Sequence, residues 1–239
     1  MLLADWEGNF YYAHLSDPEG KGWSSEKLLD RIVIQKSTNG GRSYDSGSWC
    51  GFRHPKDQDK PWLCADPKTG NLACTWTEFD KYNSKNTEKD HSRILFSQSL
   101  DAGKSWSEAV SINQFDGDCL DDDTTTEGAV PAYGPKGEIY VAWAYDDKIW
   151  FDRSSDGGKT WLDRDIVAAA RPGGWAISID GLSRTNVMPV IVCDLSEGPN
   201  HGTLYLCWGD QRNGPEDTDI FLAKSLDGGT TWSNPFRVN

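Results

Sequence analysis

The chain has 239 residues, of which 37% are hydrophobic, and it carries a formal net charge of −13. This length suffices for a large core in a single all-β domain, and the apolar share separates the chain from disordered proteins. The negative charge repels phosphate backbones and anionic lipid surfaces, so we expect no nucleic-acid partner. No apolar run approaches the roughly 18 residues of a membrane span, so none is expected. The first ten residues lack the basic start and the cleavage site of a signal peptide.

Four similar octamers occur along the chain: STNGGRSY at 37–44, SLDAGKSW at 99–106, SSDGGKTW at 154–161 and SLDGGTTW at 225–232. In the third copy, Ser154 and Asp156 can accept hydrogen bonds from the backbone of a tight turn. Gly157 and Gly158 supply backbone conformations that other residues avoid, and Trp161 returns to the sheet as a large apolar side chain. We therefore interpret each octamer as a hairpin between two strands, with an acidic residue that is structural rather than catalytic.

The same order of predicted strands surrounds each octamer. The second strands read NFYYAH, NLACTW, EIYVAW and TLYLCW, and the third strands, DRIVIQKS, SRILFSQS, DKIWFDRS and TDIFLAKS, run straight into the octamers. Alternating apolar residues, many of them β-branched or aromatic, favour strands over helices throughout. Each repeat is then a four-stranded antiparallel unit, and we place the units at about 1–50, 59–113, 127–169 and 187–239 of one domain spanning 1–239.

Two sets of residues recur at fixed places in these units. Trp76, Trp143 and Trp208 end the second strands in one register, with His14 at the same place in the first unit. This identical placement predicts core packing between units rather than sugar stacking. Prolines at 61, 131 and 189 are expected at the first residue of a first strand, where the missing N–H is tolerated.

The octamer pattern S-x-D-x-G-x-T-W resembles the Asp-box, or BNR repeat, and nearly the whole chain is similar to the sialidase-like superfamily of β-propellers. The resemblance implies an all-β propeller of four-stranded antiparallel blades. Such propellers have six blades and four are recognisable in this chain, so we expect an open arc, part of a six-bladed propeller. A closed ring of four blades is the alternative. An open arc exposes blade edges, which predicts self-association. The resemblance also implies an extracytoplasmic or secreted location.

The resemblance places a functional site around the propeller axis, on the face made by the segments entering the first strands and by the loops between second and third strands. A sialidase needs three arginines for the substrate carboxylate. In the family the first of them lies two residues before a proline at the start of an inner strand. The matching triplets of this chain, DKP at 59–61, AVP at 129–131 and VMP at 187–189, contain no arginine. The arginines that could converge instead are Arg53, Arg171, Arg184 and Arg212.

Two carboxylates from neighbouring units, Asp59 and Glu127, are expected near the axis because they lie shortly before Pro61 and Pro131. Such a pair can serve as acid and base in glycoside hydrolysis, although acidic groups also line propeller funnels by default. The catalytic candidates are Asp59, Glu127, Arg184 and Arg212. The candidate binding residues, from loops of the same face, are Asp122, Tyr145, Asp146 and Asp210.

The run DGDCLDDDTTTE at 116–127 is rich in oxygen ligands. Asp116, Asp118 and Glu127 take the first, third and twelfth positions of an EF-hand loop, but Leu120 and Asp121 break that pattern at the fifth and sixth. The run is therefore not an EF-hand. An irregular calcium site at Asp116, Asp118, Asp122 and Glu127 stays open, beside the simpler interpretation of a solvated loop whose acids cap turns. No cofactor is required.

The six cysteines show no metal-binding spacing, and we expect packed free thiols, with disulfides as the alternative in an exported protein. Three functions remain open. The leading hypothesis is a carbohydrate-active propeller, perhaps a glycoside hydrolase, in which an arginine orients an anionic substrate. The second is a non-catalytic propeller that binds a glycan or a protein on the same face. The third is a structural repeat in a larger exported protein. A carboxyl group with a raised pKa that faces a pocket would favour the enzyme.

Overall fold

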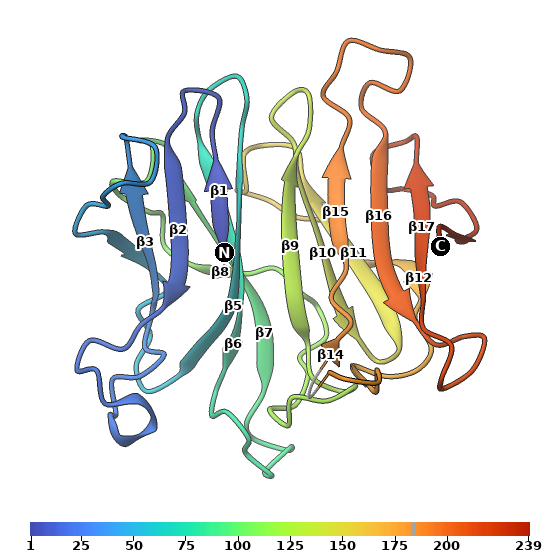
Figure 1. Ribbon diagram of the computed structural model, residues 1–239, viewed down its shortest axis with the longest axis horizontal. Coiled ribbons are helices and arrows are strands. Elements are labelled where there is room, and N and C mark those ends of the chain that lie inside the picture. The colour runs from blue at the N-terminus through green and yellow to red at the C-terminus, as the bar shows by residue number, and fades with distance from the viewer. Residues whose placement is uncertain (183–184) are drawn as a thin grey trace.

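The protein is an arc of four antiparallel sheets, called blades 1 to 4 in chain order (Figure 1). The computed structural model describes residues 1–182 and 185–239. Blade 1 contains β1 (Leu2–Ala4), β2 (Phe10–Leu15), β3 (Ile32–Ser37) and β4 (Ser48–Cys50). Blade 2 contains β5 (Asp57–Ala65), β6 (Leu72–Phe79), β7 (Ser92–Ser99) and β8 (Val110–Ser111). Blade 3 contains β9 (Glu127–Tyr133), β10 (Ile139–Tyr145), β11 (Lys148–Ser154) and β12 (Ile166–Ala170). Blade 4 contains β15 (Val190–Cys193), β16 (Leu204–Asp210), β17 (Asp219–Ser225) and β18 (Phe236–Arg237).

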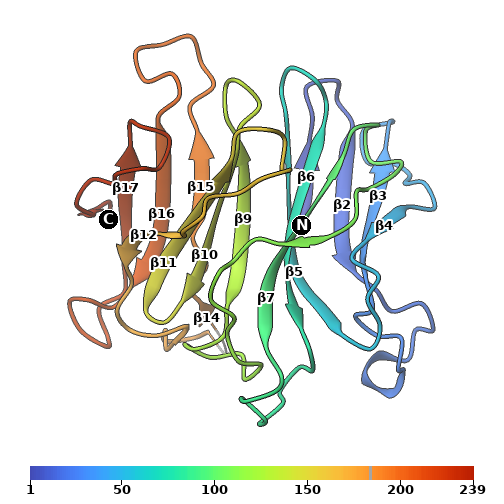
Figure 2. The same ribbon diagram turned by 180° about the vertical axis from the view of Figure 1, so that it is seen from behind.

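The blades stand side by side with their inner strands together. The inner strands β9 and β15 lie in front in Figure 1, and the outer strands β11 and β12 lie in front in Figure 2, which shows the molecule from behind. Blades 1 and 4 lie at opposite ends of the arc in both views. The expectation of an all-β propeller made of four-stranded antiparallel blades is confirmed, and the arrangement is an open arc.

Each octamer forms the hairpin between the third and fourth strands of its blade. In blade 3, Asp156 accepts backbone hydrogen bonds from Lys159 and Thr160 at 3.0 and 2.9 Å, and Gly158 donates to the Ser154 hydroxyl at 2.8 Å. The worn copy in blade 1 keeps the arrangement, because the Asn39 side chain accepts from the backbone N–H of Ser43 at 3.0 Å. The octamers therefore hold themselves closed with short-range hydrogen bonds.

Three hydrophobic clusters, one between each pair of adjacent blades, form the core. Trp76, Trp143 and Trp208 are at most 2% exposed and pack toward the preceding blade, as their common register predicts. Each interface buries one of these rings, and its burial contributes about 2–3 kcal/mol to the stability of that interface. His14, their counterpart in blade 1, is instead partly exposed and stacks on Tyr12, with ring centroids 4.9 Å apart.

Three features differ from the expectations or add to them. Pro61 and Pro131 lie inside β5 and β9 rather than at their first residues. Both belong to inner strands with one unpaired edge, and Pro61 lies at a bulge. At neither position does strand pairing need the backbone N–H that proline lacks. Before blade 4 the chain adds a small sheet of β13 (Ala176–Ile177) and β14 (Thr185–Asn186), and a 3-10 helix, η1 (Gly22–Ser24), lies between β2 and β3. All six cysteines are free.

Replacing Trp76 by alanine should lower the free energy of unfolding by about 3–5 kcal/mol, since the change removes a fully buried ring. It also leaves the buried Gln58 oxygen without the indole donor that now lies 2.6 Å away. Urea unfolding followed by circular dichroism measures the loss. Trp6→Ala, at a residue that is 51% exposed, is the control and should change stability by less than about 1 kcal/mol. Equal losses in the two variants would contradict this account of the core.

Candidate functional site

A lysine near the propeller axis holds three carboxyl groups from two blades together. The Lys60 ammonium lies 2.9 Å from Asp59 Oδ2, 2.9 Å from Glu127 Oε2 and 3.5 Å from Asp121 Oδ1. The Lys60 side chain is only 15% exposed, and that of Glu127 is fully buried. A cation is required at this point because several carboxylates cannot be buried together without one.

The inner strands of blades 2 and 3 bring these groups together. The ladder between β5 and β6 shifts register between Asp59 and Trp62, and Lys60 takes a left-handed backbone conformation with φ of 55°. This bulge turns the Lys60 side chain toward the neighbouring blade, where Glu127 is the first residue of β9. Asp59 stabilises the bulge by accepting the Lys60 backbone N–H at 2.7 Å.

Aromatic residues from two loops surround the acidic end of the site. The Tyr82 hydroxyl donates to Asp121 Oδ2 at 2.7 Å, and the Trp175 indole donates to Asp121 Oδ1 at 3.1 Å. The Lys60 ammonium also lies 5.8 Å from the centre of the Phe79 ring and 5.9 Å from that of Trp175, within range of cation–π attraction. These loops belong to the face on which the sequence predicts a site.

The surroundings give different protonation states to Glu127 and Asp121, two of the three acids around Lys60. Burial, with the neighbouring Asp121 carboxylate, raises the pKa of Glu127 to about 8 although Lys60 opposes the shift. Burial also acts to raise the pKa of Asp121, but the Tyr82 hydrogen bond and the Lys60 charge outweigh it and lower that pKa below its ordinary value. Glu127 is therefore protonated at neutral pH while Asp121 is ionised.

A cavity of about 650 Å³ opens on one side of this cluster. Asp59, Lys60, Pro61 and Trp62 line it from blade 2, and Tyr12, His14 and Leu15 line it from blade 1. Glu127 does not line the cavity, because Lys60 lies between its carboxyl group and the open space. A ligand in this cavity would meet an ion pair and aromatic rings, the surroundings that bind the hydroxyl groups and apolar faces of sugars.

Arg212 and Asp210, two further candidates, bind each other. Arg212 Nε lies 2.9 and 3.0 Å from the two oxygens of Asp210, and its guanidinium group lies 3.9 Å from the centre of the Phe221 ring. Asp210 is buried and also accepts the Trp208 indole N–H at 2.8 Å. This arginine is committed to a pair that holds the loop between β16 and β17.

Two of the remaining arginine candidates also have partners of their own. Arg53 pairs with Glu78 at 3.4 Å, and the buried Arg171 donates to the carbonyl of Gly174. Burial lowers the pKa of Arg171 from its ordinary value. The fourth candidate, Arg184, lies outside the described residues.

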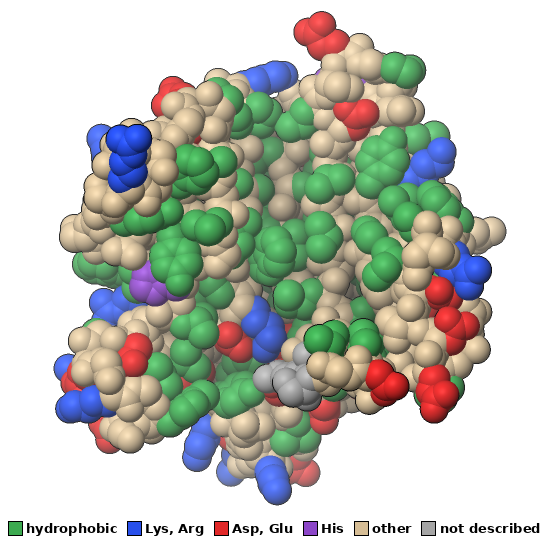
Figure 3. All heavy atoms as spheres, in the orientation of Figure 1, with side chains coloured by type: hydrophobic (Ala, Val, Ile, Leu, Met, Phe, Trp, Pro, Cys, Tyr) green, Lys and Arg blue, Asp and Glu red, His purple; other side chains and the backbone are tan. Residues whose placement is uncertain are grey.

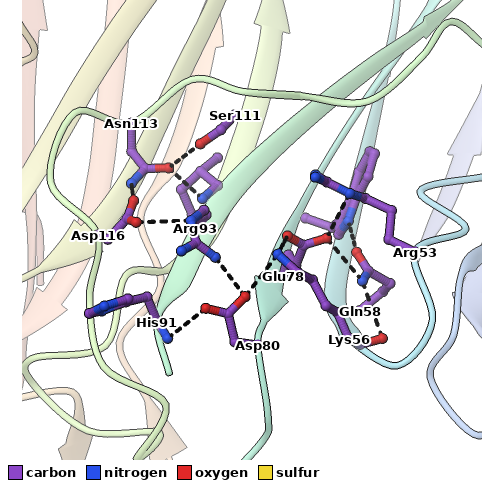
Figure 4. A network of polar contacts seen from close by, with 12 residues as sticks. Arg53, Lys56, Gln58, Glu78, Asp80, His91, Arg93, Ser111, Asn113 and Asp116 are labelled. Carbon is purple, nitrogen blue, oxygen red and sulfur yellow. Dashed lines mark hydrogen bonds and ion pairs between the residues drawn. The ribbon is translucent and has the colours of Figure 1, made fainter. Parts of the chain in front are cut away.

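A second polar network occupies the same end of blade 2 (Figure 4). Glu78, fully buried, pairs with Lys56 at 3.0 Å, and Lys56 reaches Asp80 at 2.8 Å. Arg93 continues the chain by bonding Asp80 at 2.8 Å and Asp116 at 2.9 Å. Cations and carboxylates alternate throughout, so the network satisfies its own charges and joins β5, β6 and β7 to the loop that leads toward β9.

The other predicted binding residues serve local structure. Asp122 accepts the backbone N–H of Thr124 at 3.0 Å, and the Tyr145 carbonyl accepts the Trp150 indole N–H at 3.0 Å. Asp146 pairs with the neighbouring Lys148 at 2.5 Å on the surface. The structure thus brings Asp59 to Glu127 and Asp210 to Arg212, and leaves these three residues in separate contacts.

Acidic side chains of the run at 116–127 are already engaged by hydroxyl groups of the run and by cations of blade 2. Asp118 accepts the hydroxyl groups of Thr124 and Thr125 at 2.7 Å, Asp116 is paired with Arg93, and Glu127 is paired with Lys60. Within residues 1–182 and 185–239, no three His, Cys, Asp or Glu residues are grouped so that they could hold a metal ion. The donors of the expected calcium site at Asp116, Asp118, Asp122 and Glu127 do not form one in this arrangement, and we propose no step through calcium.

The sequence pattern did not single out Lys60, Asp121, Tyr82 or Trp175. Lys60 is the middle residue of the triplet DKP, next to Asp59, which takes the place of the arginine in the family pattern. A lysine between an aspartate and a proline, at a place expected near the axis, is the one signal that could have identified it.

Comparison with known proteins gives the fold but no sequence relative. No family model matches the chain, and no curated protein matches it. Among solved structures, a NanB sialidase from Streptococcus pneumoniae aligns over 100% of this chain and 51% of its own, with 11% identity and a TM-score of 0.66. The intramolecular trans-sialidase from Ruminococcus gnavus aligns over 100% of this chain and 70% of its own, with 13% identity and a TM-score of 0.64.

An α-L-arabinofuranosidase from Fusarium graminearum aligns over 99% of this chain and 65% of its own, with 16% identity and a TM-score of 0.67. This chain therefore spans about half the length of the pneumococcal sialidase and about two thirds of the fungal enzyme. In the described part of the chain, no helix has the length and hydropathy that a membrane crossing requires. At these identities the likeness concerns the fold alone: the chain has the fold of the sialidase-like β-propellers and matches part of one.

Proposed function

We propose that the chain binds a neutral carbohydrate at the cavity beside Asp59 and Lys60, without cleaving sialic acid. The observation that carries the proposal is the Asp59–Lys60 ion pair, which lines a 650 Å³ cavity together with Trp62 and Tyr12. A carboxylate and an ammonium offer an acceptor and donors to sugar hydroxyl groups, and the aromatic rings offer surfaces for the C–H faces of a sugar.

The charge around the cavity argues against an anionic sugar. Lys60 already faces Asp59, Asp121 and Glu127, so no excess positive charge is left for a substrate carboxylate. Arg212, which could have supplied such a charge, is held by Asp210. A sialic acid carboxylate would therefore meet carboxylates without the bidentate arginine contacts that normally compensate its desolvation.

Binding is favoured over catalysis because the acid with the raised pKa does not reach the cavity. Glu127 is protonated at neutral pH, as a general acid should be, but its carboxyl group is fully buried behind Lys60. A proton donor must come within hydrogen-bond reach of the glycosidic oxygen, and in this site the lysine would have to move first. Hydrolysis of a neutral glycoside with Glu127 as acid is the second candidate function, supported by that pKa.

The first test is a glycan array joined to a turnover assay. The wild-type chain should release no sialic acid from a fluorogenic sialoside, and it should retain a set of neutral glycans. Asp59→Asn should weaken the binding of those glycans about tenfold or more, because it removes a charged hydrogen-bond acceptor. Asp163→Asn, at an exposed residue before β12, is the matched control and should bind like the wild type.

Two results would contradict the proposal. One is robust release of sialic acid that Asp59→Asn abolishes, and the other is an array on which Asp59→Asn and the wild type behave alike. Hydrolysis of neutral aryl glycosides, including the arabinofuranoside that the likeness to the Fusarium enzyme suggests, would support the second candidate if Glu127→Gln abolished it.

The pKa of Glu127 predicts a pH dependence of stability. The folded protein keeps this proton up to about pH 8, whereas the unfolded chain releases it near the ordinary value of 4.5. Between these values the folded state binds more protons, so its stability falls as pH rises, by up to about 1.4 kcal/mol per pH unit from this group. In Glu127→Gln that contribution should vanish, and the two proteins should diverge in urea unfolding between pH 5 and 8. Parallel profiles across that range would show that the carboxyl group is ionised in the folded protein.

A further inference from the structure

One aromatic side chain in a loop of blade 1 lies almost wholly in solvent. Trp23, in the 3-10 helix η1 between β2 and β3, is 75% exposed, more than any other aromatic residue in the described part of the chain. Hydrophobic side chains are also spread over the side of the arc that carries the inner strands, down to the loops at its lower edge (Figure 3). A single exposed apolar residue needs no explanation by itself. What matters is whether the protein holds this ring in a fixed place beside the candidate site.

Tyr82 supports the Trp23 ring from one side. The two rings stack with centroids 5.8 Å apart and an angle of 19° between their planes. The Tyr82 backbone N–H donates to Asp57 Oδ2 at 2.8 Å, and its hydroxyl group donates to Asp121 Oδ2 at 2.7 Å. The Tyr82 ring also packs edge-on against Phe79, with centroids 5.3 Å apart. One face of the indole thus rests on an anchored ring, and the exposed area belongs to its opposite face and its edges.

The loop that carries Trp23 is closed by its own hydrogen bonds. The Asp17 carboxylate accepts the backbone N–H of Gly22, the first residue of η1, at 3.1 Å. The Leu29 N–H donates to the Ser16 carbonyl at 2.9 Å and joins the two ends of the loop. A ligand that stacks on Trp23 therefore does not have to order the loop first, which lowers the entropic cost of binding.

A row of aromatic rings leads from Trp23 to the candidate site. Tyr82 stacks on Trp23 and packs edge-on against Phe79. The Lys60 ammonium lies 5.8 Å from the centre of the Phe79 ring. The Asp121 carboxylate gives a second connection, because it accepts the Tyr82 hydroxyl and lies 3.5 Å from Lys60. No contact in the row exceeds 5.8 Å, so a chain of a few sugar units is long enough to touch both Lys60 and Trp23.

The charges on this side of the site favour a neutral ligand. In the loop of Trp23, Glu19 pairs with Lys21 at 3.0 Å and with Lys27 at 3.1 Å, so acidic and basic side chains compensate one another. The C–H face of a sugar ring stacks on an indole without any charge, while its hydroxyl groups stay in water at the edges. At the other end of the row, three carboxyl groups face the single Lys60 ammonium, which disfavours an anionic sugar.

We propose that Trp23 is the platform of a second sugar subsite, so that the ligand of the Asp59–Lys60 site is a neutral oligosaccharide rather than a single sugar. This subsite rests on the proposed function, whose substrate class it narrows to chains of several units. One unit lies beside the Asp59–Lys60 ion pair, and another stacks on the exposed face of Trp23. Because the two subsites come from blades 1 and 2, the ligand spans the junction between these blades.

The test compares single sugars with chains on one glycan array. The array carries arabinose, xylose, glucose, galactose and mannose, each as a single unit and as chains of two to five units. The wild type should bind the chains of a series several times more tightly than its single unit. Trp23→Ala should weaken the chains about three- to tenfold, the contribution of one aromatic stack, and leave single units unchanged.

Two further variants control for a general effect of losing an aromatic ring. Trp23→Tyr keeps a ring at the platform and should restore part of the affinity for chains. Trp6→Ala, at a tryptophan that is 51% exposed in the turn between β1 and β2, should bind like the wild type. Isothermal titration calorimetry with the best-bound series gives the affinities, and circular dichroism with urea unfolding shows that each variant is folded.

Asp59→Asn separates this subsite from the function on which it rests, because it should weaken single units and chains alike. A wild type that retains no neutral glycan of any length, or Asp59→Asn that binds like the wild type, would overturn the proposed function and the subsite together. Equal binding of single units and chains by the wild type would overturn the subsite alone. So would chains that Trp23→Ala binds as tightly as the wild type does, or a loss in Trp23→Ala that is equal for both lengths, because the ring would then act through Tyr82 on the ion pair.

Discussion

The close packing of the octamers of blades 3 and 4 on the blades before them is the constraint on which the rest of the molecule depends. Gly158 and Gly229 have left-handed backbones, and a Cβ on either would lie within 2.4 Å of a phenylalanine ring of the neighbouring blade. Glycine is therefore required for two reasons at once, conformation and space. This contact fixes the distance between blades at the outer end of these two interfaces, and the buried tryptophans fill the remaining gap. Small changes at these glycines would separate whole sheets rather than disturb one turn.

That spacing determines what can meet near the axis. The inner strands β5 and β9 lie side by side, so the bulge at Lys60 reaches Glu127 on the next blade without any loop of its own. A lysine with a positive φ carries a cost of about 1–3 kcal/mol, and the ion pair with Asp59 and the hydrogen bond to the Glu127 carboxyl group offset it. The site is thus preorganised by the strands. Its chemistry follows from burial, since the same lysine that permits Glu127 to be buried also separates it from the cavity.

Much of the fold could be predicted from the sequence because it depends on local repetition. The octamers, the alternation of the strands and the common register of Trp76, Trp143 and Trp208 each recur several times, and each recurrence checks the others. The candidate site depends on contacts that occur once. Lys60 contacts Glu127, 67 positions further along the chain, because of a strand bulge that no sequence pattern indicates. By contrast, the short distance of Asp59 and Glu127 from a following proline was enough to predict that both lie near the axis. Arg212 shows the opposite case. The sequence suggests an arginine free to bind a ligand, but the structure pairs its guanidinium group with Asp210.

The terminal blades show how repetition constrains the surface as well as the core. A blade whose two faces had adapted separately to solvent would carry polar residues at alternate positions of its exposed face. Blade 4 instead keeps Tyr205, Ile220 and Leu222 at the places where blade 3 has buried residues, and blade 1 keeps Phe10 and Tyr12. Such faces cost solubility unless something covers them. The apolar residues of these two faces are therefore the kind of residues that the buried interfaces between blades contain. A further blade packed on either face would need the same glycine and aromatic contacts that space the blades within the arc.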